Sequence, residues 1–199
     1  MSAASKPLAT WETLAALGDA PCEVIHGVIV HKAEPTAEHG DAQGSLAETL
    51  RSRFHGSRGG PKNPGGWWIF VEVDVELMQH EIYRPDLVGW RRDRVPERPR
   101  GRPIRAQPDW VCEVLSMSNA KTDLVDKLDT YRRAGIPHYW IVDPETETLT
   151  VHRWTPDGYL IALRAARGET VRAEPFDAIE IAVGTFFGDE WIPPVVGEP

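Results

Sequence analysis

The sequence is poor in cysteine, with only Cys22 and Cys112. Both stand among apolar residues, which favours buried small side chains over a disulfide bond or a zinc site, since zinc requires more ligands at close spacing. Long apolar runs are also lacking. No run approaches the roughly 20 residues of a membrane-spanning helix, and the N-terminal segment has no continuous apolar core of the kind a secretion signal needs. We therefore expect a soluble protein of the reducing cytoplasm, with no membrane partner.

An excess of positive charge is missing too. The 199 residues include 22 Lys and Arg against 30 Asp and Glu, which gives a formal net charge of -8. Proteins that coat nucleic acid through bulk electrostatics need clustered basic residues, so any nucleic-acid contact has to be local. The length suits one domain, which we place over residues 1–187. The last stretch, 188–199, has the composition of a frayed tail.

Hydrophobic periodicity predicts a mixture of helices and strands. We expect a short capped helix from Thr10 to Gly18, and longer helices over 36–55 and from Ser118 or Asn119 to Ala134. Strands are expected over 22–32, where a hairpin starts, and over 67–77, 82–90, 110–115 and 138–143, followed by a hairpin of 148–154 and 158–165. The strand–helix–strand order over 110–143 is a crossover, so part of the sheet should be parallel.

Glu113 interrupts the apolar run WVCEVL of a strand that should be covered on both faces. A carboxylate buried there costs several kcal/mol unless it is paired, protonated or bound to a cation. A structural ion pair with an arginine is one explanation, and a functional site is the other.

Asp86 follows Pro85 and opens the apolar run LVGW. Alone it indicates little, because Pro-Asp pairs are common in turns. Its interest comes from Glu113 on what should be a neighbouring strand. Two carboxylates that converge from adjacent strands form a hard-oxygen site suited to Mg²⁺ or Mn²⁺.

Lys127 falls on the apolar face of the predicted third helix. At about 100° per residue it lies within the arc of inward positions, which are Ala120, Leu124, Leu128, Tyr131 and Ala134. A structural lysine can extend its ammonium group to solvent from such a position. Because the helix starts directly after the Glu113 strand, an inward lysine would instead point back toward the carboxylates.

Several segments together resemble the Uma family of restriction endonucleases. They are RPDLV, PDWVCEVLS, SNAKTDLVDKLDTYRRAGIPHYWIVDP and the opening CEVIHGVIV, which is followed by Pro35 and His39. The resemblance spans roughly residues 8 to 187, and its central stretch is specific. The family belongs to the PD-(D/E)XK nuclease superfamily. It implies an α/β fold of the restriction-endonuclease-like type, a mixed β-sheet flanked by helices, here with a C-terminal β-hairpin extension.

The resemblance implies that Asp86 is the motif aspartate and Glu113 the motif glutamate, both of them metal ligands. The sequence departs from the superfamily pattern two residues after Glu113, where Leu115 stands in place of lysine. Lys127 is the implied replacement, since it would reach the same space from the following helix.

Two further positions match the opening segment of the family. Glu23 matches its acidic residue, which implies a third member of the acidic cluster and a shared metal ligand. His39 matches as well, with an implied catalytic role. A lone histidine at the start of a helix is nevertheless more often structural or exposed.

The implied activity is metal-assisted hydrolysis of phosphodiester bonds in DNA, with Mg²⁺ or Mn²⁺ as cofactor. Asp86 and Glu113 would hold the ion, which polarises the scissile phosphate and acidifies a bound water. Lys127 would orient that water and stabilise the charge of the transition state. Restriction-like enzymes that cut both strands usually act as dimers, so the resemblance also implies a homodimer.

The segment from Arg91 to Arg105 is an Arg- and Pro-rich loop without an apolar period, with seven arginines against Asp93 and Glu97. Such a loop can grip phosphates without reading bases, or it can be a solvated loop that needs no partner. Five tryptophans fall in predicted strands, where core packing explains them better than base stacking: Trp67, Trp68, Trp90, Trp110 and Trp140.

Two other classes of function stay open. The first is a catalytically inactive module that binds nucleic acid or a protein partner, which Leu115 in the lysine position favours. The second is a metal-dependent hydrolase of small phosphoester or carboxyl substrates with the same acidic site. Because sites rather than folds determine function, the fold alone does not choose among them.

Overall fold

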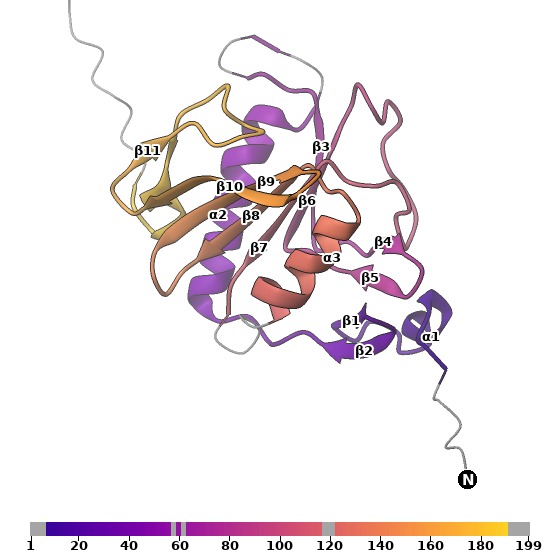
Figure 1. Cartoon of the computed structure of the whole chain (residues 1–199). Coiled ribbons are helices and arrows are strands. Elements are labelled where there is room, and N and C mark those ends of the chain that lie inside the picture. The colour runs from indigo at the N-terminus through magenta and orange to yellow at the C-terminus, as the bar shows by residue number, and fades with distance from the viewer. Residues whose placement is uncertain (1–6, 57–58, 61–62, 117–121, 191–199) are drawn as a thin grey trace, which may run out of the picture.

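The computed structural model describes residues 7–56, 59–60, 63–116 and 122–190 (Figure 1). The helices are α1 (Trp11–Ala15), α2 (Ala37–Phe54), the π-helix η1 (Thr122–Lys127), α3 (Leu128–Arg133) and the 3-10 helix η2 (Val183–Phe187). The strands are β1 (Cys22–Ile25), β2 (Val28–His31), β3 (Trp67–Val71), β4 (Val75–Met78), β5 (Glu81–Tyr83), β6 (Leu87–Arg91), β7 (Trp110–Val114), β8 (His138–Asp143), β9 (Thr148–Thr155), β10 (Gly158–Ala166), β11 (Thr170–Val171) and β12 (Ile181–Ala182).

A six-stranded mixed sheet, ordered β10-β9-β8-β7-β6-β3, forms the centre of the molecule. Strands β7 and β8 are parallel, as the crossover predicted, and the other neighbours are antiparallel. Helix α2 lies on one face of this sheet and α3 on the other (Figure 1). The predicted fold class is thus confirmed, and the β9–β10 hairpin extends the main sheet at one end.

A second, four-stranded sheet, ordered β2-β1-β5-β4, stands beside the first. The β1–β2 hairpin turns at His26 and Gly27, both with positive φ. A single ladder pair, Val24 with Ile82, joins it to β5. This small sheet brings the N-terminal hairpin next to the beginning of β6 in the main sheet.

Two predicted strands are each divided between the two sheets, so their single-strand predictions were wrong. The segment 67–77 breaks at Glu72, whose φ of 47° ends β3, and the chain resumes as β4 in the small sheet. Val71, expected to face inward, is 39% exposed. The segment 82–90 divides in the same way into β5 and β6. Alternation alone does not reveal a transfer between sheets, because both halves keep their period.

The third predicted helix begins as a π-helix. Its predicted caps, Ser118 and Asn119, lie outside the described residues. Leu124, expected to face inward, is 45% exposed, whereas Lys127 is buried as expected. The π-helix bonds each residue to the fifth one along rather than the fourth, so the α-helical angle of 100° per residue does not apply to its first turn.

The remaining elements follow the sequence closely. Thr36 caps α2 by accepting a hydrogen bond from the His39 backbone, and Thr10 forms a capping box at α1, which is shorter than predicted. Cys22 and Cys112 are free and buried. No helix in the described part of the chain is long and apolar enough to span a bilayer. Of the predicted tail, residues 191–199 lie outside the described part.

The outer edge of β3 is closed by side chains from the end of α2. The Ile69 amide donates to His55 Nδ1 at 3.0 Å, and the Ile69 carbonyl accepts from Arg51. At the opposite end of the sheet, β10 pairs with β9 through a register shift between Ile161 and Leu163. Both outer strands thus carry a local irregularity.

Candidate active site

Asp86 and Glu113 lie opposite each other on neighbouring strands. Leu87 of β6 pairs with Cys112 of β7, and the same antiparallel register continued by one residue places Asp86 opposite Glu113. Asp86 is 2% exposed and Glu113 is 1% exposed. The convergence predicted from the sequence is present, and the two carboxylates sit where water cannot stabilise their charges.

Glu113 is held by two groups from the helical segment that follows its strand. The Tyr131 hydroxyl donates to Glu113 Oε1 at 2.6 Å, and Lys127 Nζ lies 3.1 Å from Glu113 Oε2. Burial, reinforced by the charge of Glu113, holds the pKa of Tyr131 well above its usual value. The phenol therefore stays protonated and acts as a donor. A lysine, rather than the arginine considered above, balances the buried carboxylate.

Lys127 joins two carboxylates from different sheets. Its Nζ lies 3.2 Å from Glu23 Oε1 on β1 and 3.1 Å from Glu113 Oε2 on β7, and its side chain is 3% exposed. Glu23 Oε1 also accepts from the Arg84 backbone amide at 2.8 Å. Such charge-assisted bonds fix the ammonium group in one place, although it comes from a helix rather than from the strand of Glu113.

Asp86 is surrounded by donors. Its Oδ2 accepts from the Val114 amide at 2.8 Å and lies 3.3 Å from His39 Nε2, while its Oδ1 lies 3.1 Å from Lys32 Nζ. Burial alone would raise the pKa of Asp86, but the His39 hydrogen bond and the Lys32 charge bring it below its usual value. Asp86 is therefore ionised at neutral pH. His39 Nδ1 is buried and has no hydrogen-bond partner among the described residues.

The two carboxylates open onto a small cavity of about 30 Å³. That volume accommodates a water molecule or an ion. Besides Asp86 and Glu113, the charged and polar residues that line it are Lys32, His39, Glu72, Ser116 and Lys127. Glu23 does not line it and reaches the cluster through Lys127. The structure therefore brings all five predicted site residues together, with four of them at the cavity.

Lys32 and Glu72 are site residues that the sequence reasoning missed. Lys32 Nζ donates to the Arg84 carbonyl at 2.9 Å and contacts Asp86. The backbone amide of Glu72 donates to the Asp86 carbonyl at 3.3 Å, which aligns Glu72, Asp86 and Glu113 across three neighbouring strands. A lysine at a strand end and a glutamate in an alternating strand are ordinary surface features. Only the strand register gives them a place in the site.

The donor set fits a hard divalent cation. Among the described residues no cluster of three His, Cys, Asp or Glu side chains is arranged to hold a metal. Mg²⁺ does not require one, because it is commonly bound by one or two carboxylates together with water and substrate phosphate. Asp86 and Glu113 supply that pair. With Glu23, three carboxylates face the ammonium groups of Lys32 and Lys127, which leaves one negative charge for a cation to balance.

Comparisons with known proteins agree with this arrangement. A model of the Uma2 family, described as "putative restriction endonuclease", matches residues 11–184. Among solved structures, a "putative nuclease" of the DUF820 family from Anabaena variabilis is similar, with a TM-score of 0.69 and 20% identity over 89% of this chain and 97% of that chain. Identity this low shows a shared fold alone. No functionally curated protein matches the sequence.

Proposed function

The chain belongs to the Uma2 family, and we propose that it is a metal-dependent endonuclease that hydrolyses phosphodiester bonds in DNA. The observation that carries the proposal is the pair of buried carboxylates, Asp86 and Glu113, which face each other across two strands and share one small cavity with two lysines. Isolated buried charges of this kind are costly, and a cation together with an anionic substrate would offset that cost.

In this proposal Asp86 and Glu113 bind Mg²⁺ or Mn²⁺. The bound cation supplies Lewis-acid polarisation of the phosphate and a more acidic water. The Val114 amide and His39 hold the Asp86 carboxylate in place, and Tyr131 holds Glu113. Partners of this kind orient metal ligands and tune their basicity. His39 therefore positions a ligand through Nε2.

The two lysines have different places in this scheme. Lys127, fixed between Glu23 and Glu113, presents a positive charge to the cavity and stabilises the negative charge that develops on the phosphate. Lys32 neutralises Asp86 at the opposite wall. Glu23 acts through Lys127, since it does not reach the cavity itself. This assigns the lysine function of the superfamily to a helix, in place of Leu115.

The test is cleavage of supercoiled plasmid with Mg²⁺ or Mn²⁺ by the wild type, Asp86→Asn, Glu113→Gln and Lys127→Met. A matched control is Glu145→Gln, whose exposed carboxylate lies in the turn between β8 and β9. We expect metal-dependent cleavage by the wild type and the control, and loss in the three site variants while their circular dichroism stays native.

An inert wild type, or site variants that cut as fast as Glu145→Gln, would contradict the nuclease proposal. A wild type that binds DNA without cutting it would favour the inactive binding module. Hydrolysis of small phosphoesters in preference to DNA would favour the second alternative. We also propose a homodimer, which sedimentation velocity tests directly, with a single monomeric species as the contrary result.

A further inference from the structure

The arginine-rich loop between β6 and β7 is fastened to the protein. Four of its seven arginines are paired with carboxylates, in the pairs Arg91–Asp93, Arg94–Asp109, Arg102–Asp74 and Arg105–Glu76. Its backbone is tied to the sheet by indole donors, because Trp68 bonds the Val95 carbonyl at 3.0 Å and Trp90 bonds the Ala106 carbonyl at 2.8 Å. The loop therefore forms a fixed platform beside β3.

The other three arginines of the loop carry its available positive charge. The Arg92 guanidinium lies 3.9 Å above the Trp68 ring, and that of Arg98 lies 5.3 Å from the centre of Phe70. Arg98 and Arg100 are exposed, line an open groove, and form no ion pair within the described residues. Glu97 lies between them and the rest of the loop as the carboxylate of this stretch.

An independent observation shows that the field here is positive. His55 sits edge-on to Trp68 and Phe70, with ring centres 6.0 Å and 6.1 Å away. Burial and the positive charges of Arg51, Arg98 and Arg92 hold the pKa of His55 below its usual value. Arginines from the loop and from α2 therefore act together at this one spot, although the chain as a whole is acidic.

This surface leads directly away from the candidate active site. Trp68, Phe70 and Glu72 point to the same face, because alternate residues of a strand share a face. Glu72 lines the cavity. At a rise of about 3.3 Å per residue, Phe70 lies roughly 7 Å and Trp68 roughly 13 Å along the strand from Glu72. A polymer that leaves the cavity in this direction would pass Arg98 and then Arg92.

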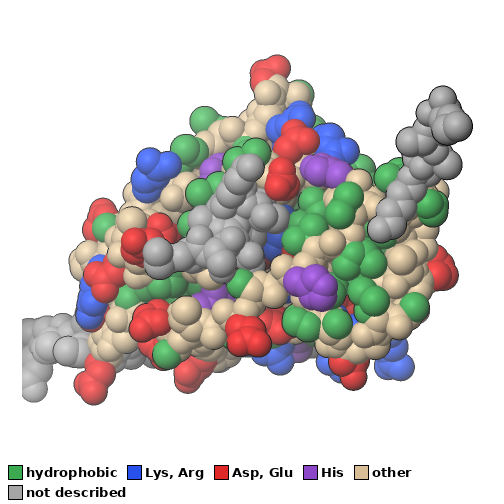
Figure 2. All heavy atoms as spheres, turned by 90° about the horizontal axis from the view of Figure 1, so that it is seen from below, with side chains coloured by type: hydrophobic (Ala, Val, Ile, Leu, Met, Phe, Trp, Pro, Cys, Tyr) green, Lys and Arg blue, Asp and Glu red, His purple; other side chains and the backbone are tan. Residues whose placement is uncertain are grey.

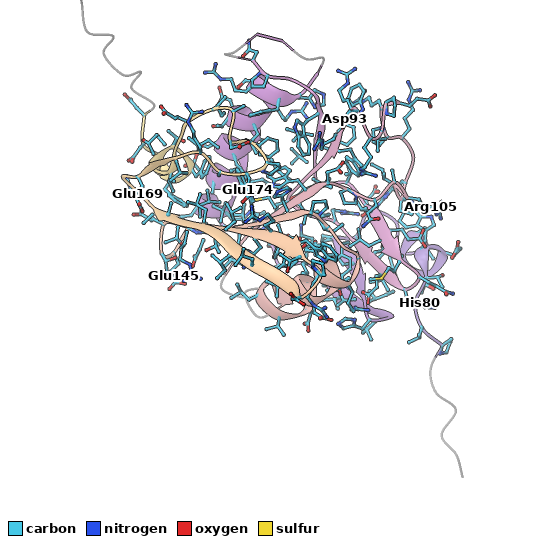
Figure 3. The ribbon with its side chains drawn as sticks, turned by 45° about the horizontal axis from the view of Figure 1, so that its top comes forward. His80, Asp93, Arg105, Glu145, Glu169 and Glu174 are labelled. Atoms are coloured by element: carbon cyan, nitrogen blue, oxygen red, sulfur yellow. The ribbon has the colours of Figure 1, made fainter. Side chains whose placement is uncertain are left out.

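The distribution of charge over the molecule supports the same direction. Figure 3 shows Asp93 and Arg105, which both belong to the loop, on one side of the molecule, with Glu145, Glu169 and Glu174 on the opposite side. In Figure 2, which views the molecule from below, Asp and Glu side chains are spread over the face while Lys and Arg lie mostly near its outline. The loop side is thus the favourable one for a polyanion.

We propose that Arg92, Arg98 and Arg100, supported by Trp68 and Phe70, bind the phosphodiester backbone of the nucleic-acid strand that leaves the active site. The nature of the ligand rests on the proposed nuclease function. Arginine contacts to phosphates fix position and add affinity without reading bases. This surface therefore binds regardless of base sequence, and its binding weakens as salt rises.

The test is the affinity of the full chain for fluorescein-labelled 20-nucleotide DNA and RNA strands in EDTA, measured by anisotropy at several salt concentrations. The variant is Arg98→Gln with Arg100→Gln. The matched control is Arg164→Gln, an exposed arginine on β10 at the other end of the sheet. We expect the double variant to raise Kd about tenfold and to reduce the salt slope by about 2, one for each lost phosphate contact.

Unchanged affinity and slope in the double variant, an equal loss in Arg164→Gln, or a wild type that binds neither strand at low salt would each overturn the inference. Comparison of the DNA and RNA arms identifies which strand is bound. Because EDTA removes the metal, binding is measured apart from cleavage. Binding that depends on the loop without any cleavage would leave this inference standing while the proposed function fails, and cleavage with neutral loop variants would do the reverse.

Discussion

The two faces of the main sheet are built differently, although the same strands supply both. Toward α2, strand β7 presents Cys112 and Val114 to a cluster that is apolar throughout and contains Trp110, Trp140 and Phe176. Toward α3, the same strand presents Val111 and Glu113, and the latter meets a lysine and a tyrosine hydroxyl. One face is occupied by packing alone. The other combines packing with charge, so substitutions on the two faces should have separable effects.

The largest effect that tests this separation is expected at Glu113. Glu113→Gln should reduce the cleavage rate about 10⁴-fold, or roughly 5 kcal/mol of transition-state stabilisation, because it removes a charged ligand. The fold should persist, since the amide keeps the size of the carboxylate. Initial rates of plasmid nicking and thermal unfolding measure the two effects.

The control for this prediction is the neighbouring residue on the opposite face. Cys112→Ala should lower stability while leaving the nicking rate of the folded protein near that of the wild type. A similar loss of rate in both variants would show that the two faces are not separable.

The next largest effect is expected in the apolar cluster. Trp140 is fully buried, with ring centres of Trp110 and Phe176 each 5.5 Å away, and its indole donates to the Glu174 carbonyl. Trp140→Ala should lower the free energy of unfolding by about 3–5 kcal/mol because it leaves a large cavity. Urea denaturation measures this loss. A change of more than tenfold in the rate of the remaining folded fraction would count against the comparison.

A smaller effect links the two properties at Tyr131. Tyr131→Phe removes a hydrogen bond to a charged group, at a cost of about 1.5–3 kcal/mol in stability. It should also weaken Mn²⁺ binding by about 10- to 100-fold, as expected when a ligand loses its supporting partner. Calorimetric titration with Mn²⁺ measures the second effect.

Tyr159→Phe is the matched control, because the Tyr159 hydroxyl donates to the Ile136 carbonyl at 2.8 Å. It removes a phenol bond that is unrelated to the carboxylates. If both variants bind Mn²⁺ equally well, Tyr131 has only a structural role.

The smallest effect is a pH dependence on the α3 face, away from the site. His152 is buried against Tyr139 and Tyr159, and burial holds its pKa below the usual value. The folded state thus favours neutral imidazole. Its contribution to stability is present above about pH 6.5, the ordinary value, and is lost as pH falls through the lower folded pKa.

His152→Phe should flatten the pH dependence of the unfolding free energy below pH 6.5, measured by urea titration between pH 5 and 8. Some dependence should remain, because burial also lowers the pKa of His138. A curve that coincides with the wild type would show that His152 does not contribute.

Local patterns predicted much of the fold. Thr36 and Thr10 as helix caps, the hairpin at β9 and β10, and the parallel pair around the crossover all depend on short-range chemistry or chain connectivity, which the sequence carries directly. The breaks that divide β3 from β4 and β5 from β6 were missed, because they depend on pairing with a second sheet. The π-helical turn before α3 was missed as well.

The site divides in a similar way. Asp86, Glu113 and Lys127 were predicted because each is a charge in a position where an apolar residue would be expected. Lys32 and Glu72 could not be found by that criterion, since both occur where charged residues are ordinary. Their importance comes from register and from the approach of the small sheet, which are tertiary properties.

The closed edges of the main sheet bear on how two copies of the chain could associate. Strand addition requires an outer strand with a regular row of free amides and carbonyls. Arg51 and His55 occupy the groups of Ile69 on β3, and the register shift interrupts β10. Growth of the sheet across two molecules is therefore disfavoured at both ends. A homodimer of this protein would have to form through side-chain surfaces, with each sheet ending inside its own subunit.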